Sequence, residues 1–400
     1  MAERVPGTMT VIGMISGTSY DAVDAGVADL WQEGEELVLR PRGLYSKDLP
    51  DQLRADIAAA LPPHPTSLAE VCRLDTVIGQ LFGAVAAAAN AEYADGAADL
   101  AVSHGQTVYH WVEGGRALGT LQLGGAAWVA AASGLPVVSD LRTRDITAGG
   151  HAAPLASTLD ALLLLADDVP RGALNLGGIS NITVRDEQGD VLAYDIGPAS
   201  ALLDSVVTHA TGGAERMDTG GARAARGTVD PEVLRAFLAE PYYDLPAPKS
   251  TGKELFHAEY VSEVLTRTGR ATPSPDDLLA TLTELTAELV ARACRQHRVT
   301  ELVVAGGGAR NPTLMRRIGA LAAPATVTLI DDYGLPAQGK EAYLFAVLGY
   351  LTVHGLPGTV ATATGARSAS VLGSITPGRS ALVLPAPAPA PPRRLRIEPA

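Results

Sequence analysis

The sequence has few cysteines, aromatic residues and charges for its length of 400 residues. Its two cysteines, Cys72 and Cys294, lie far apart, which excludes a disulfide framework or a cysteine metal cluster. We expect both to be small buried apolar residues. Aromatic residues make up only 4% of a chain that is 47% hydrophobic, so the buried volume must come from Ala, Val and Leu. The formal net charge of -13 disfavours nonspecific binding to nucleic acid or to an anionic membrane.

Long hydrophobic runs and two common nucleotide motifs are also missing. The apolar runs at 84–89 and 159–166 are too short to span a bilayer. The first residues show a glycine-interrupted strand pattern and no signal-peptide core. We therefore expect a cytoplasmic protein with no membrane or nucleic-acid partner. Neither a Walker motif nor a Gly-x-Gly-x-x-Gly turn after a first strand occurs, which disfavours those two nucleotide folds.

The order of strand and helix patterns predicts two α/β domains. A chain of this length exceeds the size at which one core stops growing. An apolar strand, a glycine turn and a returning strand occur at residues 11–28 and again at 173–195, which predicts two similar domains. We place the first domain at residues 1–150 and the second at 151–376. Residues 377–400 form a Pro/Ala-rich tail that favours polyproline II or disorder over packing.

Three glycine-rich turns follow apolar strands, at residues 17–19, 177–180 and 306–309. For the first turn, an ordinary hairpin and a phosphate-binding loop are both open interpretations, because Ser and Gly serve both. Three such turns in a duplicated chain fit a nucleotide held between two domains. The first two turns would bind phosphates, and the third would approach the adenine and ribose.

Phosphoryl transfer also needs a carboxylate, to hold metal or accept a proton. Asp195 stands out because it ends a predicted strand and precedes a turn into a helix. A catalytic base and a helix-capping aspartate are both open interpretations of this residue. The other candidate carboxylates at strand ends or in turns are Asp21, Asp24, Asp140 and Asp145.

Polar loops supply candidate sugar contacts. Residues 103–107, Ser-His-Gly-Gln-Thr, follow a buried strand and could bind a sugar through amide and hydroxyl groups, although a lone histidine is usually structural. The glycine-bearing connection at 140–154 has the length and composition of a binding loop. Residues 248–254 carry two lysines around a turn, which suits a solvated loop or a phosphate contact.

Taken together, these stretches resemble the 1,6-anhydro-N-acetylmuramic acid kinase family. The resemblance runs from Thr10 to Pro377, and its motifs appear in the family's order. The matching stretches are residues 13–24, 103–107, 140–154, 175–181, 195–198, 248–254, 306–311 and 364–366.

The resemblance implies an α/β fold of the actin, sugar kinase and Hsp70 type, with two RNase-H-like domains around a central nucleotide cleft. It implies ATP with Mg²⁺ and a possible homodimer, and it assigns no metal ligands. The implied reaction serves cell-wall recycling. ATP phosphorylates O6 of the anhydro sugar while water opens the 1,6-anhydro bridge, giving N-acetylmuramic acid 6-phosphate and ADP. Asp195 matches the catalytic aspartate that activates the water.

The resemblance also implies the binding residues. The nucleotide-binding residues are Gly17, Thr18, Ser19, Tyr20, Asp21, Ala22, Val23, Asp24, Gly177, Gly178, Gly306, Gly307 and Gly308. The substrate-binding residues are Ser103, His104, Gln106, Thr107, Asp140, Arg142 and Glu341.

The chain departs from the family's usual residues mainly around the expected sugar site. The departures are Ala22, Tyr109, His151, Ala152, Ala199 and Ser200. Two alternatives therefore stay open. One is a kinase for another 1,6-anhydro sugar such as levoglucosan, and the other is a non-catalytic actin-like nucleotide sensor.

Overall fold

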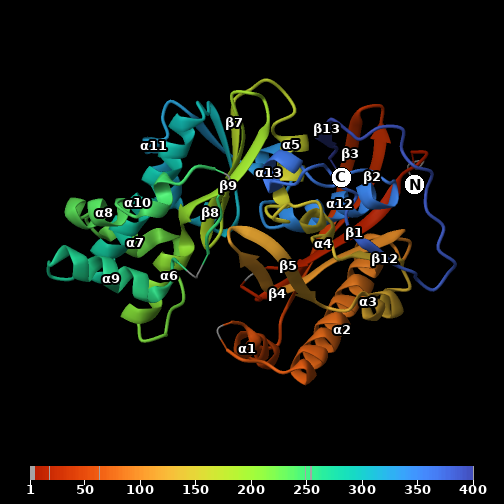
Figure 1. Cartoon of the computed structure of the whole chain (residues 1–400), viewed down its shortest axis with the longest axis horizontal. Helices are drawn as coiled ribbons and strands as arrows, with labels where there is room; N and C mark the ends of the chain where they lie inside the picture. Colours follow the sequence, from red (N-terminus) through yellow and green to blue (C-terminus); the bar gives the residue numbers. More distant parts are fainter. Residues whose placement is uncertain (1–4, 18, 63, 248, 253–254, 400) are drawn as a thin grey trace. The chain divides into compact units, whose positions relative to one another are not determined.

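The computed structural model describes residues 5–399 except 18, 63, 248, 253 and 254, and it divides into two compact units. Unit 1 comprises Met1–Ala166 and Gly334–Ala400, and unit 2 comprises Asp167–Tyr333. The expected boundaries at 150 and 376 differ from these. The difference arises because the chain returns to unit 1 after Tyr333 and packs there on the first strand (Figure 1).

The sheet of unit 1 has the strand order β12-β6-β4-β1-β2-β3-β13, with β5 paired to β4. β1 runs antiparallel to β2 and parallel to β4, β2 is antiparallel to β3, and β4 is parallel to β6. The strands are β1 Met9–Ser16, β2 Ala22–Glu33, β3 Glu36–Asp48, β4 Leu100–Glu113, β5 Arg116–Leu123, β6 Val137–Ser139, β12 Ser374–Thr376 and β13 Arg394–Ile397.

The sheet of unit 2 has the order β11-β10-β7-β8-β9. β7 is antiparallel to β8 and parallel to β10, β8 is antiparallel to β9, and β10 is parallel to β11. This is the order and direction of β6-β4-β1-β2-β3 in unit 1, so the predicted pair of RNase-H-like α/β domains is confirmed. The strands are β7 Arg171–Leu176, β8 Ile179–Arg185, β9 Val191–Pro198, β10 Glu301–Ala305 and β11 Thr326–Leu329.

Two long helices cover opposite faces of the unit 1 sheet because side chains alternate along β1. Ile12 and Met14 pack in one cluster with Leu74 and Phe82 of α2, which begins after the Ser67 cap. Gly13 points the other way: a Cβ there would lie 2.1 Å from the carbonyl oxygen of Ala342, so α12 packs directly on the strand backbone. The unit 1 helices are α1 Asp51–Ala60, α2 Leu68–Tyr93, α3 Ala126–Ser133, α4 Thr143–Thr147, α5 Ala156–Leu163, α12 Lys340–Val353 and α13 Ala361–Thr364.

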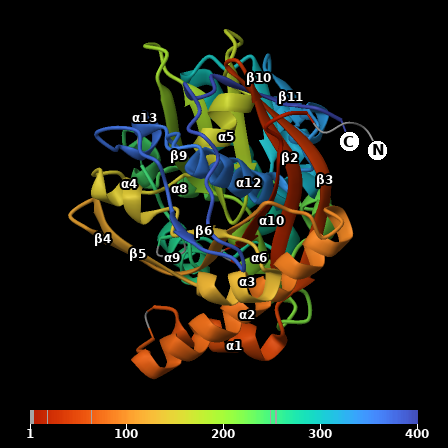
Figure 2. The same ribbon diagram turned by 90° about the vertical axis from the view of Figure 1, so that its right-hand side faces the viewer.

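α2 is the one helix in the described part of the chain whose length and composition would suit a membrane span. Its buried residues include Leu74, Ile78 and Phe82, which pack with the sheet of unit 1. Figure 2 shows α2 with α1 and α3 at the lower edge of the view. This packing is that of a core helix.

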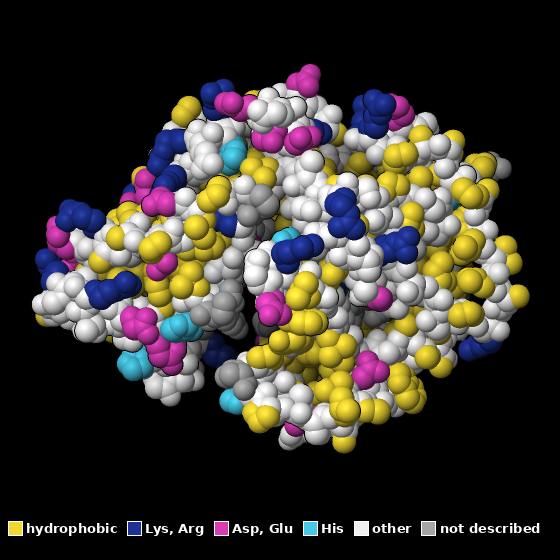
Figure 3. Space-filling model, viewed as in Figure 1, with side chains coloured by type: hydrophobic (Ala, Val, Ile, Leu, Met, Phe, Trp, Pro, Cys, Tyr) yellow, Lys and Arg dark blue, Asp and Glu magenta, His cyan; other side chains and the backbone are white. Residues whose placement is uncertain are grey.

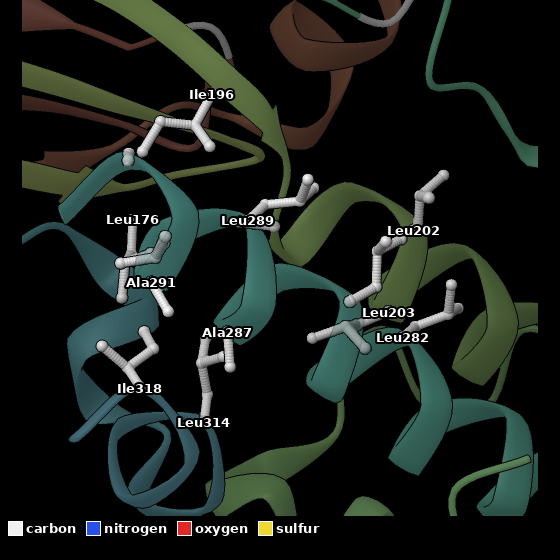
Figure 4. Close-up of a cluster of buried hydrophobic side chains, with 14 of the residues drawn as sticks. Leu176, Ile196, Leu202, Leu203, Leu282, Ala287, Leu289, Ala291, Leu314 and Ile318 are labelled. Carbon is white, nitrogen blue, oxygen red and sulfur yellow. The ribbon is translucent and has the colours of Figure 1, made fainter. Parts of the chain in front are cut away.

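The core of unit 2 is built around α10. Figure 4 shows Leu282 and Leu289 of α10 with Leu202 of α6 and Leu314 of α11 in one buried cluster. Cys294 of α10 is buried as predicted, whereas Cys72 is exposed. The unit 2 helices are α6 Ser200–Ala210, α7 Ala222–Arg226, α8 Pro231–Leu238, α9 Ala258–Thr268, α10 Pro275–Gln296 and α11 Pro312–Leu321, with short 3-10 turns η1 Thr219–Gly221, η2 Pro241–Asp244, η3 Gly307–Arg310 and η4 Ile330–Tyr333.

The end of the C-terminal tail packs on unit 1, whereas the sequence predicted polyproline II or disorder rather than packing. β13 pairs in parallel with β3 and buries Leu395. Glu36 accepts ion-pair contacts of 2.8 Å from both Arg394 and Arg396, and Arg40 pairs with Glu398. The alternation of arginine and apolar residues that follows the Pro/Ala tract therefore explains why the end of the tail forms a strand.

Candidate active site

The opening turn joins β1 to β2 in a hairpin, as one interpretation of the sequence predicted. The Tyr20 amide donates to the Gly17 carbonyl over 3.0 Å, and Tyr20 has a left-handed φ of 44°. A Cβ on Gly17 would meet only Ser19 Oγ, at 4.0 Å. Thr18 lies outside the described residues. Phosphate binding by this turn stays a prediction.

The side chains that follow the turn mainly contact other residues of the protein. Asp21 pairs with Arg54 at 2.8 Å, and the Val23 side chain lies in the core of unit 1, which leaves only its backbone for a ligand. Asp24 accepts a 2.6 Å hydrogen bond from Ser46 Oγ. Burial raises the pKa of the Asp24 carboxyl, the Ser46 bond lowers it, and nearby Asp48 raises it again.

The expected nucleotide glycines divide into two kinds. Gly306 has a φ of 89°, and a Cβ there would lie 2.6 Å from Asn175 Oδ1; a Cβ on Gly308 would lie 2.7 Å from Leu176 Cβ. The fold therefore needs these two glycines so that the ends of β10 and β7 can approach. Gly307 has nothing within 4 Å, and Gly177 and Gly178 make only ordinary contacts from 3.4 Å outward.

At the glycines of the second kind, no close contact with the described residues requires the absence of a Cβ. These are Gly17, Gly177, Gly178 and Gly307. None has a left-handed φ, and each has room for a Cβ. Such positions suit the close approach of an external group to the backbone.

Gln106 is a link in the protein frame rather than an open substrate contact. Ser16 Oγ donates to Gln106 Oε1 over 2.6 Å. Gln106 Nε2 donates to the carbonyls of Gly17 and Thr107 over 3.3 and 3.1 Å. The buried amide of Gln106 thus ties the opening turn to β4, and Thr107 Oγ1 accepts from Gln122 Nε2. With three hydrogen bonds to the protein, the Gln106 side chain has little capacity left for a sugar.

Buried His104 and half-buried Arg142 form a pair that connects β4 to the 140–154 loop. Arg142 Nε donates to His104 Nε2 over 2.9 Å, so His104 Nδ1 carries the proton and donates to the Gly105 carbonyl over 3.0 Å. Burial, and then the Arg142 charge, lowers the pKa of His104 to about 3. Both ring nitrogens are occupied, so His104 orients Arg142 rather than presenting a free nitrogen to a substrate.

Arg142 itself is held on a second side by the Ala152 carbonyl. Burial lowers the pKa of the Arg142 guanidinium to about 10, while Glu341 and Asp145 act in the opposite direction. Arg142 therefore stays protonated at neutral pH and is a cation held in a fixed position.

Asp145 is a structural carboxylate. It is 0% exposed, Oδ2 accepts from the Ala152 amide over 2.7 Å, and Oδ1 accepts from Thr364 Oγ1 over 2.8 Å. These bonds fix the residues around His151, whose amide donates to the Thr364 carbonyl. The loop expected at 140–154 is thus an ordered segment that contains α4.

Glu341 lies at the start of α12 beside a buried ion pair. Lys340 Nζ is 2.5 Å from Asp160 Oδ1, and both side chains are buried. The Glu341 residue is exposed, yet desolvation raises the pKa of its carboxyl, while Lys340 and Arg142 lower it and Asp24 raises it. Glu341 thus shares an electrostatic environment with Arg142 and Asp24.

A cavity of about 290 Å³ opens in unit 1 beside these residues. Three of the predicted substrate residues, Ser103, His104 and Asp140, contribute to its wall. Asp75 of α2 and Thr120 and Gln122 of β5 were not predicted, because no sequence motif marks them, whereas Thr143 lies in the predicted 140–154 stretch. The lining residues are Asp75, Ser103, His104, Gly105, Thr120, Leu121, Gln122, Leu123, Gly124, Gly125, Ala126, Ser139, Asp140 and Thr143.

The β4–β5 hairpin next to the cavity exposes apolar side chains. Hydrophobic side chains gather over this hairpin in Figure 3. The exposed large ones on β4, β5 and α3 are Tyr109, Trp111, Val112, Leu118, Leu121 and Trp128. Tyr109, one of the departures from the family pattern, belongs to this apolar rim.

Asp195 lies within β9 rather than at its end, because the strand continues to Pro198. The register between β8 and β9 shifts between Ser180 and Asn181, which leaves Ile196 as the extra residue of a β-bulge. Asp195 Oδ2 accepts from the Thr251 amide over 2.9 Å, and the carbonyl of Asp195 accepts from Tyr242 Oη over 2.8 Å. Asp195 does not cap a helix: the carbonyls of Gly177 and Gly178 receive the first amides of α6.

Lys249 is a structural lysine rather than an open phosphate contact. Its Nζ donates to the carbonyls of Tyr242 and Tyr243 over 3.0 and 2.9 Å and lies 4.7 Å from the centre of the Tyr242 ring. Burial lowers the pKa of Lys249, and Arg292 acts in the same direction. Lys253, the second lysine of this stretch, lies outside the described residues.

No group of three or more His, Cys, Asp or Glu side chains that could hold a metal occurs among the described residues.

Comparison with known proteins gives one consistent result over nearly the whole chain. The family model described as anhydro-N-acetylmuramic acid kinase matches residues 9–378. A protein of that name from Streptomyces coelicolor is 56% identical over 97% of this chain and 99% of its own, and one from Rhodococcus erythropolis is 49% identical over 98% and 100%.

Solved structures show a weaker likeness. A ROK family glucokinase from Streptomyces griseus in complex with glucose and AMPPNP is 12% identical, with a TM-score of 0.35, over 85% of this chain and 99% of its own. The activator of the 2-hydroxyisocaproyl-CoA dehydratase from Clostridium difficile is 14% identical, with a TM-score of 0.38, over 86% and 94%.

Proposed function

Because the chain belongs to the anhydro-N-acetylmuramic acid kinase family, we propose that it phosphorylates 1,6-anhydro-N-acetylmuramic acid with ATP. The γ-phosphoryl group passes to O6 while water adds to C1 and opens the anhydro bridge. The products are N-acetylmuramic acid 6-phosphate and ADP. The observation that carries this proposal is the match of 56% identity over 97% of the chain, which includes every motif named above.

Asp195 is the base in this proposal. One carboxylate oxygen is held by the Thr251 amide, which fixes the orientation of the group. The carboxylate accepts a proton from the water that attacks C1. The bond between C1 and O6 breaks as O6 forms its bond to the γ-phosphorus, so the leaving oxygen of the acetal is the phosphoryl acceptor. ADP is released from the other side of the phosphorus.

The glycines without an internal steric reason are the proposed nucleotide contacts. Gly17 in unit 1 and Gly177, Gly178 and Gly307 in unit 2 leave backbone that phosphate oxygens or the nucleoside can approach. Mg²⁺, when bound with ATP, neutralises phosphate charge. We propose that Gly306 and Gly308 act indirectly, by placing Gly307 at the end of β10.

Arg142 is the proposed cation of the sugar site, with His104 and the Ala152 carbonyl holding it in place. A guanidinium fixed on two sides recognises an anionic group such as the lactyl carboxylate with little loss of side-chain entropy. Levoglucosan has no such group, so this arrangement favours the muramic acid derivative.

We also propose a cytoplasmic homodimer.

A panel of sugars tests the function directly. The protein is mixed with ATP, Mg²⁺ and either 1,6-anhydro-N-acetylmuramic acid, levoglucosan, N-acetylmuramic acid or no sugar, and ADP release is recorded. We expect rapid release only with the first sugar. Faster turnover of levoglucosan would replace the proposed substrate, and ATP binding without ADP release in any mixture would favour the nucleotide sensor. Light scattering on the same sample measures the oligomeric state.

A further inference from the structure

Asp195 is held by its main chain and its side chain at once, by three residues that follow it in unit 2. β9 is the outermost strand of its sheet, and the Asp195 amide donates away from β8, to the Lys249 carbonyl, over 3.0 Å. Tyr242 Oη donates to the Asp195 carbonyl over 2.8 Å, and the Thr251 amide donates to the carboxylate over 2.9 Å. The direction of the carboxylate therefore depends on how firmly these three residues are themselves held.

The Lys249 side chain connects these contacts to one another. Its ammonium donates to the carbonyls of Tyr242 and Tyr243 over 3.0 and 2.9 Å. The same ammonium lies 4.7 Å from the centre of the Tyr242 ring and 5.8 Å from that of the Tyr194 ring, where the aromatic faces attract a cation. The backbone around Lys249, which bonds to Asp195, is therefore anchored to η2, which carries the tyrosine that also bonds to Asp195.

The surroundings of the ammonium oppose its charge. Burial, and then Arg292 of α10, lowers the pKa of Lys249, while Asp244 acts in the opposite direction. Asp244 is itself paired with Arg292. The two carbonyls and the two rings thus offset the cost of a half-buried cation. A methionine, which is similar in length but uncharged, would make neither of the two hydrogen bonds.

We propose that Lys249 and Tyr242 are positioning residues for Asp195, an inference that rests on the proposed function. Lys249 fastens its own backbone to η2, and this backbone together with Tyr242 Oη fixes the main chain of Asp195. The Thr251 amide, two residues after Lys249, then meets the carboxylate in one orientation. Neither Lys249 nor Tyr242 touches the reacting atoms in this arrangement, and both act through the carboxylate that accepts the proton.

Replacing Lys249 should change turnover more than binding. In Lys249→Met both hydrogen bonds are lost, and kcat should fall about a hundredfold because a small displacement of a reacting group is costly. The dissociation constant of ATP, measured by calorimetry, should stay within about twofold of the original value, because Lys249 orients only the base. The comparison is made at a temperature at which circular dichroism shows both proteins folded.

Two tyrosines of one aromatic cluster give a matched pair of smaller changes. Tyr242→Phe keeps the ring beside the Lys249 ammonium but loses the bond to the Asp195 carbonyl, and kcat should fall about tenfold. Tyr260→Phe is the control, and it should leave kcat unchanged. Tyr260 is 3% exposed and packs against Phe256, as Tyr242 does, but its Oη has no hydrogen-bond partner among the described residues.

A double substitution shows whether these residues act through Asp195. On the Asp195→Asn background, Lys249→Met should lower the residual rate by less than about twofold, because the group that it positions is already lost. A further loss as large as that in the original protein would overturn the assignment. If Lys249→Met does not fold, the same pair of measurements with Tyr242→Phe decides the question.

Hydrogen exchange follows the same contacts without turnover. The amides of Asp195 and Thr251 should exchange faster in Lys249→Met than in the unmodified protein, and at the original rate in Tyr260→Phe. Unchanged exchange of both amides in Lys249→Met would overturn the assignment, even if activity falls. If the unmodified protein releases no ADP with the sugar, the proposed function fails, whereas the exchange rates still show whether Lys249 holds Asp195.

Discussion

Units 1 and 2 contain the same five-strand order, but the residues near the ends of their strands make different kinds of contact. In unit 1 polar side chains within β4 bond to the segments that follow β1 and β6: Gln106 bonds to the opening turn, and His104 bonds to Arg142. In unit 2 the turns after β7 and β10 present Gly177, Gly178 and Gly307 with no side chain and little around them. The same scaffold thus supplies a rigid polar frame around a cavity in one unit and accessible backbone in the other.

The largest expected effect comes from replacing Asp195, the proposed catalytic base, which lies in unit 2. Asp195→Asn should lower turnover about a thousandfold, because the amide cannot accept the proton but can still receive the Thr251 bond. ATP affinity, measured by calorimetry, should stay within twofold of the original. Turnover above a tenth of the original rate would show that another group accepts the proton.

The two kinds of glycine give the next largest effect. Gly306→Ala should lower the free energy of unfolding by about 2–4 kcal/mol, since φ is left-handed and the Cβ meets Asn175 and Leu176. Gly307→Ala should keep or raise stability by up to about 1 kcal/mol, while weakening ATP binding. Denaturant unfolding and ATP titration separate the two results. Undiminished ATP affinity in Gly307→Ala would remove that residue from the nucleotide site.

Acid should weaken the polar frame of unit 1 through His104. Its pKa of about 3 lies below that of an unfolded histidine, so between these values the unfolded chain binds the extra proton. His104 makes its full contribution to the free energy of unfolding above the pKa of histidine in the unfolded chain. This contribution falls by about 1.4 kcal/mol per pH unit as the pH drops toward 3. In the His104→Gln variant, the free energy of unfolding should depend less steeply on pH over this range. An identical pH slope in both proteins would contradict a neutral buried His104.

The ion pairs of β13 should give the smallest effect. Glu36→Gln removes the partner of Arg394 and Arg396 and should cost about 0.5–1 kcal/mol at low salt, with the difference vanishing at high salt. Arg298→Gln, which breaks an exposed 3.0 Å pair with Glu187, is the control and should change nothing measurable. Thermal unfolding at two salt concentrations makes the comparison.

Local pattern was sufficient to predict much of the fold. The hairpin of β1 and β2, the repeated unit around Gly177 and the amphipathic α10 all follow from hydrophobic periodicity and turn residues within short windows. The return of α12 to unit 1 was not predictable in this way, because its contact with Gly13 joins residues more than three hundred positions apart. The pairing of β13 with β3 was missed for the same reason.

The candidate site was predictable in outline but not in roles. Residue type left a ligand contact open for His104, Gln106 and Lys249, beside a structural or solvated role for His104 and Lys249. Their hydrogen-bond partners, which only the three-dimensional structure shows, occupy all three side chains. Conversely, the wall of the cavity from α2 and β5 has no sequence motif. A motif locates a site, but the hydrogen bonds decide which of its members face a ligand.

The path of the chain also determines the order in which its parts can become complete during synthesis. Unit 2 is one continuous segment, Asp167–Tyr333, inserted into unit 1. All of its strands are synthesised before α12 and β13. Unit 1 must hold an unfinished sheet, with the Gly13 face of β1 uncovered, until the last residues arrive. Unit 2 should therefore acquire protease resistance on a nascent chain first, and unit 1 only after α12 and β13 have emerged.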